Sequence, residues 1–343
     1  MATKHLLDSE LLPIAELPAF KFTRDKLPDF RAALAQAIEL QDASEYGVRR
    51  ESVSVPGPDY DVPCLLYVPE EQQSRAGYLH IHGGGYVVGQ VEMSDPMNTL
   101  IASRLGVVVL SVDYRLAPEH PVPAALDDCY AGLAWLHKEA ERLGIDRDRI
   151  AIGGESAGGG LTAALAIVSR DRGDYPVCHQ HLTYPMLDNQ TGTEAFPGDP
   201  LVGEFVWTRE SNQFGWSCYL GEHPADAPYV PSRVECVEGL PPTWMFTAAL
   251  DLFRDENIDY ARRLLSAGIP TELIVMPGAC HGFQMLPGTS PGERYVSEHL
   301  QALGKALWVK ILCAIQEGLT NEKAGICSSG CDITNLGTHV DGL

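Results

Sequence analysis

The chain has 343 residues, and 45% of them carry apolar side chains, which is enough to bury one large core. Its 46 acidic and 25 basic residues give a formal charge of −21 at pH 7. A surface this negative repels phosphate backbones and anionic lipid headgroups, so we expect neither nucleic acid nor a membrane as a partner.

The beginning of the chain predicts no targeting segment. Polar residues interrupt MATKHLLDSELLPIAELPAF every few positions, and elsewhere no apolar run reaches the ~18 residues of a membrane-spanning helix. Nine cysteines without a C-x-x-C pair are typical of reduced thiols, so we expect a cytoplasmic protein. Cys327 and Cys331 have no matching His or Cys pair, and we expect neither a metal nor a cofactor.

Residues 1–45 are expected to form an N-terminal cap segment. Its stretch FRAALAQAIEL places apolar residues at helical spacing, with Phe30, Leu34 and Ile38 on one face. Two β-rich runs follow, RRESVSVPG at 49–57 and YDVPCLLYVP at 60–69, and they are joined by the turn GPDY.

From residue 78 onward, short apolar strands alternate with longer helical segments. The expected strands are 77–82, 106–114, 149–154, 179–185, 243–250 and 271–277. The expected helices are 94–105, 122–143, 157–171, 255–267 and 292–316. This alternation predicts an α/β fold with a mostly parallel central sheet flanked by helices. We assign residues 46–318 to this catalytic domain and 319–343, which are polar and Gly/Ser-rich, to a flexible C-terminal tail.

One interval, about residues 188–236, is too long to be a simple connection within the alternation. Long inserts in compact domains are usually lids or binding loops. The insert is rich in aromatic residues, namely Phe205, Trp207, Phe214, Trp216 and Tyr219. Each alone is well explained as packing on the body, but together they suit the apolar wall of a pocket. We therefore expect a helical cap here, with Phe205 and Trp207 as candidate substrate contacts.

The stretch GGESAGGG at 153–160 joins an expected strand, RIAIGG, to an expected helix. A G-x-S-x-G sequence at a strand-to-helix turn is typical of a nucleophile elbow. Ser156 would sit in a strained backbone conformation, and Gly154 and Gly158 would remove Cβ atoms that clash with neighbouring backbone. The sequence therefore predicts Ser156 as a nucleophile.

A serine hydroxyl needs a base that is itself oriented by a carboxylate. Asp251 directly follows the strand TWMFTAAL, and His281 lies on the loop GACHGF after the strand TELIVMP. Both follow Ser156 at the same edge of the expected sheet, in the order that α/β-hydrolases use. Asp255 is the competing carboxylate, but it begins a helix and is well explained as an N-terminal helix charge. Among the other histidines, His80 alternates within a strand and is interpreted as structural.

The oxyanion of acyl transfer needs backbone N–H donors. The first should be the amide of Ala157, directly after the nucleophile, and the others should come from HGGGYVVG at 82–89, a Gly-rich loop after an early strand. The side chain of His82 is interpreted as a hydrogen bonder that fixes this loop.

Several motifs together resemble the hormone-sensitive-lipase-like (bacterial family IV) carboxylesterases of the α/β-hydrolase superfamily, over about residues 40–315. They are HGGGY at 82–86, DYRLAPEHPVPAAL at 113–126, GESAGG at 154–159, TYP at 183–185, DLFRDE at 251–256 and HGF at 281–283.

This resemblance implies an α/β-hydrolase fold with a helical cap, serine-esterase activity on short- to medium-chain esters, and often a homodimer. It also implies that Gly84 and Gly85 supply oxyanion amides besides Ala157. Two positions depart from the family pattern: Glu155 replaces the usual Asp, and Leu252-Phe253 replaces Pro-Leu. Neither change alters the expected triad.

The substrate itself stays open at this point. Tyr86 and Tyr184 are further candidate substrate contacts, because they flank the oxyanion loop and the end of a strand. A non-catalytic receptor on the same fold is one alternative, although such proteins lack the triad histidine that His281 provides. An amidase or lyase that uses the same triad is another, since a fold specifies chemistry better than substrate.

Overall fold

The computed structural model of the protein describes residues 2–17 and 21–308. The predicted tail at 319–343 lies outside the described residues. So do Cys313, Cys327 and Cys331. The helix expected at 292–316 is shorter, because it ends at Ala306 and a turn follows at Leu307 and Trp308.

Eight strands form one sheet in the order β1-β2-β4-β3-β5-β6-β7-β8. The strands are β1 (Val48–Pro56), β2 (Asp61–Pro69), β3 (Gly77–Ile81), β4 (Val108–Val112), β5 (Ile150–Glu155), β6 (His179–Thr183), β7 (Thr243–Ala248) and β8 (Thr271–Met276). β2 pairs antiparallel with both β1 and β4, and all other pairs are parallel. The predicted α/β fold with a mostly parallel sheet is confirmed.

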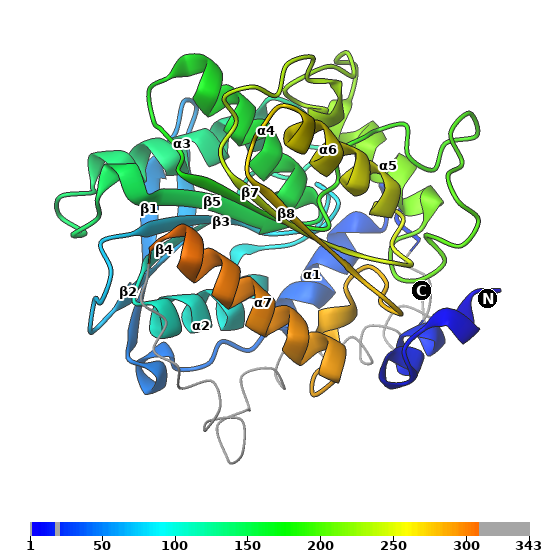
Figure 1. Cartoon of the computed structure of the whole chain (residues 1–343), viewed down its shortest axis with the longest axis horizontal. Helices are drawn as coiled ribbons and strands as arrows, with labels where there is room; N and C mark the ends of the chain where they lie inside the picture. Colours follow the sequence, from blue (N-terminus) through cyan, green and yellow to red (C-terminus); the bar gives the residue numbers. More distant parts are fainter. Residues whose placement is uncertain (1, 18–20, 309–343) are drawn as a thin grey trace.

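Helices cover both faces of this sheet (Figure 1). The α-helices are α1 (Leu27–Ala37), α2 (Asp95–Leu105), α3 (Ala124–Lys138), α4 (Ala157–Arg172), α5 (Arg209–Leu220), α6 (Arg254–Ser266) and α7 (Ser290–Ala306). The 3₁₀ helices are η1 (Lys4–Leu6), η2 (Ser9–Glu16), η3 (Ala43–Tyr46), η4 (Val91–Ser94), η5 (Arg147–Arg149), η6 (Pro231–Arg233) and η7 (Phe283–Met285). Figure 1 shows α3, α4 and α6 on one side of the sheet and α2 and α7 on the other.

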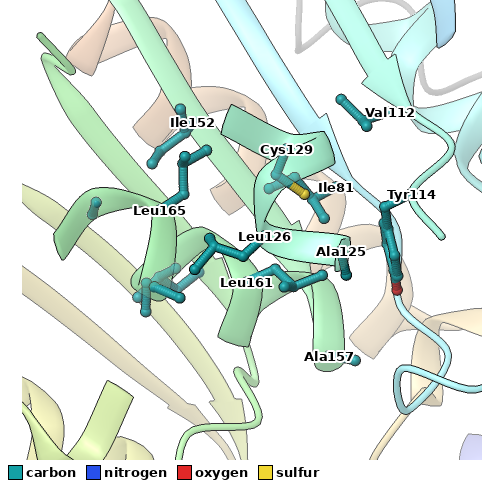
Figure 2. Close-up of a cluster of buried hydrophobic side chains, with 14 of the residues drawn as sticks. Ile81, Val112, Tyr114, Ala125, Leu126, Cys129, Ile152, Ala157, Leu161 and Leu165 are labelled. Atoms are coloured by element: carbon teal, nitrogen blue, oxygen red, sulfur yellow. The ribbon is translucent and has the colours of Figure 1, made fainter. Parts of the chain in front are cut away.

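The face under α3 and α4 is apolar. Figure 2 shows Ile81 and Ile152 of the sheet beside Leu126, Leu161 and Leu165 of these two helices. These five side chains are at most 4% exposed, which places the largest hydrophobic cluster directly below the strand-to-helix turn at Ser156. Burial of this kind contributes roughly 1.5–3 kcal/mol for each large apolar side chain.

The face under α2 and α7 is polar by comparison. Because side chains alternate between the faces of a strand, His80, Glu155 and His181 share this face. Asn98 of α2 and His299 of α7 pack onto it and are also fully buried. Buried polar groups need hydrogen-bond partners, so this face is organised by polar contacts as well as by packing.

The N-terminal segment is fastened to the body of the domain. Arg31 of α1 donates to the carbonyl oxygens of Val87 and Ala117, each at 2.8 Å, and forms an ion pair with Glu119 at 2.9 Å. The ring of Phe22 lies 5.9 Å from the indole of Trp207, centroid to centroid, so this segment and the 188–236 insert meet.

Most predicted elements begin or end within a few residues of the observed ones. The helix expected at 122–143 ends earlier, because the α-helix stops at Lys138 and turns follow it. The strand expected at 106–114 is shorter, since Gly106 has φ +60° as the left-handed C-cap of α2 and so cannot extend a strand. Within the described residues, no helix is both long and apolar enough to cross a bilayer.

Candidate active site

Ser156 occupies the sharp turn between β5 and α4. Its backbone has φ +56° and ψ −119°, a left-handed conformation that is strained for any residue with a side chain. A Cβ on Gly158 would lie 2.1 Å from the carbonyl oxygen of Ile81, and one on Gly154 would lie 2.2 Å from the same oxygen. Both distances are impossible for real atoms, so the turn requires glycine at these two positions.

The turn also explains the two glycines that open α4. A Cβ on Gly160 would lie 2.2 Å from the carbonyl oxygen of Met186, and one on Gly159 would lie 3.0 Å from Pro185. The first turn of α4 therefore packs directly against the backbone that follows β6.

Ser156, His281 and Asp251 form a hydrogen-bonded relay. The Oγ of Ser156 lies 2.9 Å from Nε2 of His281, and Nδ1 of His281 lies 2.7 Å from Oδ2 of Asp251. Oδ1 of Asp251 accepts the backbone N–H of Phe253 at 2.9 Å, so the carboxylate is held from both sides. With Asp251 accepting at Nδ1, the neutral imidazole presents an unprotonated Nε2 to the serine hydroxyl, as a general base must.

The competing carboxylate, Asp255, lies elsewhere. It is exposed and pairs with Arg254 at 2.7 Å. The departure at Phe253 also has a visible consequence, because the Phe253 ring meets the His281 ring edge-on at 5.3 Å between centroids. The side chain that replaces the usual Leu thus packs on the His281 imidazole.

The oxyanion loop lies beside the elbow. A Cβ on Gly83 would be 3.5 Å from the Cβ of Ser156, so the loop and the turn are in contact. Gly84 and Gly85 have φ +121° and +58°, and within the described part of the chain no acceptor takes their N–H groups or that of Ala157. Three unpaired amides next to a nucleophile, one of them at the N-terminus of α4, suit a developing oxyanion.

His82 holds this loop. Its Nδ1 donates to the carbonyl oxygen of Gly83 at 2.8 Å, and its ring stacks on Tyr114 at 4.2 Å. Burial lowers the pKa of His82 to about 4, so the imidazole is neutral at pH 7. It makes no contact with the triad.

Trp207 covers the oxyanion loop from the insert. A Cβ on Gly85 would lie 2.1 Å from the far edge of the Trp207 indole, whose Nε1 donates to Oδ1 of Asn212 at 3.2 Å. The preceding residue, Val206, has φ +57°, and the Trp207 N–H donates back to the carbonyl oxygen of Phe205 at 2.7 Å. A left-handed β-branched residue in so tight a turn is strained.

Ser156 is almost fully covered. Ser156 and His281 are each only 6% exposed, and Trp207 is 5% exposed. Two cavities described on the surface, of about 270 and 430 Å³, are lined by other residues.

The four candidate substrate contacts divide into two pairs. Trp207 lies over the loop, and the ring of Tyr184 lies 4.5 Å from that of His281, with its hydroxyl accepting from Gln284. Tyr86 instead stacks on Tyr219 of α5 at 3.9 Å, which joins the oxyanion loop to the cap helix. Phe205 is 2% exposed within a second apolar cluster.

Two partly buried carboxylates near the site had no role in the sequence-based prediction. Glu256 accepts the N–H of Leu187 at 2.7 Å and the hydroxyl of Thr191, which fixes the start of the insert. Burial raises the pKa of Glu256 well above its usual range. Glu155 pairs with His80. Both glutamates belong to the motifs quoted above, but sequence spacing alone did not reveal their partners.

Among the described residues, no cluster of three or more His, Cys, Asp or Glu side chains could hold a metal ion. The six cysteines in this part of the chain carry free thiols.

Residues 78–285 match the sequence profile of the family described as the alpha/beta hydrolase fold. The chain belongs to the hormone-sensitive-lipase-like α/β-hydrolases. It is 32% identical to the carboxylic ester hydrolase LipN of Mycobacterium tuberculosis over 81% of this chain and 77% of that relative.

Solved structures of this α/β-hydrolase type are similar over most of their length. A bacterial heroin esterase is 38% identical with a TM-score of 0.82, over 89% of this chain and 99% of the other. The esterase LipW of Mycobacterium marinum is 33% identical with a TM-score of 0.79, over 89% and 97% of the two chains.

Proposed function

We propose that the protein is a serine carboxylesterase that hydrolyses short- to medium-chain esters of small molecules through an acyl-enzyme on Ser156. The observation that carries the proposal is the relay from Ser156 to His281 to Asp251, with contacts of 2.9 and 2.7 Å. The relay also favours an enzyme over a ligand receptor, because a receptor has no use for a base within reach of a serine. That related proteins are named esterases supports the same activity.

The geometry suits a two-step acyl transfer. Nε2 of His281 accepts the hydroxyl proton as Oγ of Ser156 attacks the ester carbonyl, and Asp251 stabilises the imidazolium that forms. The N–H groups of Gly84, Gly85 and Ala157 would bind the oxyanion. His281 then gives its proton to the leaving alcohol, and in the second step it takes a proton from the water that releases the acid. These steps call for no cofactor.

The substitution Ser156→Ala tests the proposal. It should lower kcat/KM for p-nitrophenyl acetate by at least about a thousand-fold, because the acyl-enzyme cannot form. Labelling by an organophosphate fluoride, followed by mass spectrometry, should modify the wild-type protein once and leave the variant unmodified. Ser217→Ala, at an exposed serine of the cap helix α5, is the matched control and should keep full activity. Full turnover by the Ser156 variant would rule the mechanism out.

We further propose that Trp207 and Tyr184 border the substrate, whereas Tyr86 and Phe205 act through packing. A closed site under Trp207 favours short acyl groups, since a longer chain must displace more of the cover. Across p-nitrophenyl esters of increasing acyl length, kcat/KM should be greatest for the short acyl groups. A maximum at long chains would contradict this assignment.

The remaining proposals concern assembly and location. β8 ends the sheet and leaves one edge unpaired among the described strands, and Val275 on it is 38% exposed. An exposed edge strand can pair with a second copy, so we propose a homodimer through β8. The free thiols favour a cytoplasmic location.

A further inference from the structure

A row of polar side chains, most of them joined by hydrogen bonds, crosses the polar face of the sheet and ends at Glu155, directly before Ser156. We call it the polar row. Its members, in order, are Arg50, Asp95, Tyr67, Asn98, His80 and Glu155. They come from β1, α2, β2, α2 again, β3 and β5, so the row joins four strands and one helix. The Asp95, Tyr67, Asn98 and His80 side chains are at most 3% exposed.

The row begins with an ion pair at the edge of the sheet. Nη1 of Arg50 donates to both carboxylate oxygens of Asp95, at 2.8 and 2.9 Å. The hydroxyl of Tyr67, the cross-strand neighbour of Arg50, donates to Oδ1 of Asp95 at 2.9 Å. Because the Tyr67 proton is committed to the carboxylate, its oxygen is left to accept a hydrogen bond.

The side-chain amide of Asn98 lies between Tyr67 and His80. Asn98 lies three residues after Asp95, on the same side of α2, and its side-chain amide lies near enough to the Tyr67 hydroxyl to lower the pKa of Tyr67, against the larger effect of burial. The Nδ2 of the same amide lies 3.2 Å from Nδ1 of His80. An amide nitrogen can only donate, so Nδ1 of His80 must accept.

The tautomer of His80 is thereby fixed. With Nδ1 as the acceptor, the ring proton resides on Nε2, which donates to both carboxylate oxygens of Glu155 at 3.1 Å each. The hydroxyl of Ser111, on the neighbouring strand β4, lies 3.0 Å from Nδ1 and can donate to it as well. The hydrogen bonds from Asn98 through His80 to Glu155 thus run in one consistent direction.

Glu155, at the end of the row, contacts both the turn that carries Ser156 and the oxyanion loop. Glu155 precedes Ser156, whose strained turn is held by the Ser156 N–H donating to the carbonyl oxygen of Thr183 at 2.9 Å. The backbone carbonyl oxygen of Glu155 packs on the oxyanion loop, since a Cβ on Gly83 would lie 3.1 Å from it. A shift of Glu155 would therefore move the nucleophile and the oxyanion amides relative to each other.

We propose that His80 and Glu155 are positioning residues for acyl transfer, and that the polar row holds Glu155 in place against the oxyanion loop. The role rests on Ser156 being the nucleophile. Neither side chain exchanges a proton with the substrate. They act through the backbone of Ser156 and Gly83, where a displacement of about 1 Å can cost up to a hundred-fold in rate.

The first experiment removes the donor to Glu155. His80→Leu should lower kcat for p-nitrophenyl acetate at least tenfold per active site, with KM changed less than twofold, because substrate binding does not involve His80. Active sites are counted by titration with an organophosphate, so that loss of folded protein is not mistaken for loss of rate. His80→Gln keeps a donor toward Glu155 and an acceptor for Asn98, and it should recover most of kcat.

The second experiment breaks the row at a distance. Tyr67→Phe removes one hydroxyl from the row and should lower kcat two- to tenfold. Tyr78→Phe is the matched control, because Tyr78 is equally buried on the same face but its hydroxyl has no hydrogen-bond partner in the described residues. It should keep wild-type kcat.

Equal kcat for the two tyrosine variants would overturn the proposal. The proposal would also be overturned if His80→Leu kept the wild-type kcat per titrated site. It would be overturned as well if kcat of His80→Gln were as low as that of His80→Leu. These outcomes are distinct from a failure of the esterase assignment, in which the wild-type protein itself would not turn over the ester.

Discussion

The two faces of the central sheet are built by the same strands and yet are packed by different means. Leu79 and His80 are consecutive and both fully buried, but Leu79 belongs to the apolar cluster under α3 and α4 while His80 joins the polar row under α2. An apolar contact tolerates small shifts, whereas a hydrogen bond weakens steeply with angle. The face under α3 and α4 is thus held by apolar packing, whereas the face under α2 and α7 combines a further apolar cluster, which includes Ile101, Leu105 and Leu303, with hydrogen bonds that depend on direction.

The polar face holds a second row that is separate from the hydrogen bonds of the first. Nε2 of His179 lies 3.4 Å from Nδ1 of His181, and Nε2 of His181 lies 3.2 Å from Nδ1 of His299. The Tyr295 hydroxyl, 3.3 Å from Nδ1 of His299, continues to Thr183 at 3.1 Å. Each His–His contact needs one protonated and one unprotonated nitrogen, so His181, which uses both of its ring nitrogens in these contacts, must be neutral.

The largest predicted effect follows from these histidines. Burial lowers the pKa of His179 and of His299 to about 4, and that of His181 well below its usual range. The negative charge of Glu155 opposes part of the lowering at His299, but burial has the larger effect. Below pH 6.5 these histidines are protonated in the unfolded chain but stay neutral in the folded protein. The free energy of unfolding is therefore greatest above pH 6.5 and decreases as the pH falls toward 4. His179 and His299 should each remove about 2 kcal/mol from the free energy of unfolding by pH 5.

Urea unfolding at pH 7 and pH 5 measures this loss. His179→Gln removes one titrating group and should shrink the difference between the two pH values by about 2 kcal/mol. His223→Gln, at an exposed histidine, is the control and should leave the difference unchanged. A wild-type protein as stable at pH 5 as at pH 7 would show that the face tolerates charge.

On the apolar face, the free energy of unfolding should depend on the volume of the buried side chains and not on pH. Leu165 of α4 is fully buried in the cluster of Figure 2. Leu165→Ala should lower the free energy of unfolding by about 2–5 kcal/mol, because the substitution leaves a cavity. The same loss is expected at pH 7 and pH 5, with kcat/KM for p-nitrophenyl acetate within twofold of wild type. Leu165→Ile conserves volume and should cost less than about 1.5 kcal/mol. A large drop in kcat/KM would mean that the apolar face also orients the site.

The difference between the two faces of the sheet also explains how much of the structure could be predicted from the sequence. Strand and helix positions, the mostly parallel sheet and the family follow from local patterns, because periodicity and the G-x-S-x-G turn are properties of short segments. Ser156, Asp251 and His281 could be proposed together since each follows a strand, and the ends of parallel strands meet at one edge. The apolar face is a direct consequence of alternation in β3 and β5.

The polar face could not be predicted in the same way. Alternation shows that His80 and Glu155 point to one side, but it says nothing of Asn98, which arrives from α2 and sets the direction of the hydrogen bonds. The directions of Tyr86 and Trp207 are equally non-local. Tyr86 turns toward α5 through a backbone φ of +68°, and Trp207 reaches Gly85 from the insert. Contacts between distant segments depend on the folded backbone, which no short motif encodes.

The smallest predicted effect compares one hydroxyl on each side of the sheet. Thr162 of α4, under the apolar face, donates to the carbonyl oxygen of Gly158 at 2.7 Å. Thr99 of α2, over the polar face, is as well buried at 4% exposure, but within the described residues its hydroxyl has no partner. A buried hydroxyl without a partner costs free energy, and a hydrogen-bonded one contributes about 1 kcal/mol. Thr162→Val should therefore destabilise the protein by about 1 kcal/mol, while Thr99→Val should stabilise it by up to about 1 kcal/mol. The free energy of unfolding in urea measures both. If Thr99→Val instead lowers the free energy of unfolding more than Thr162→Val does, an ordered water molecule must hydrogen-bond the Thr99 hydroxyl. Water would then supply hydrogen bonds on the polar face that its side chains do not.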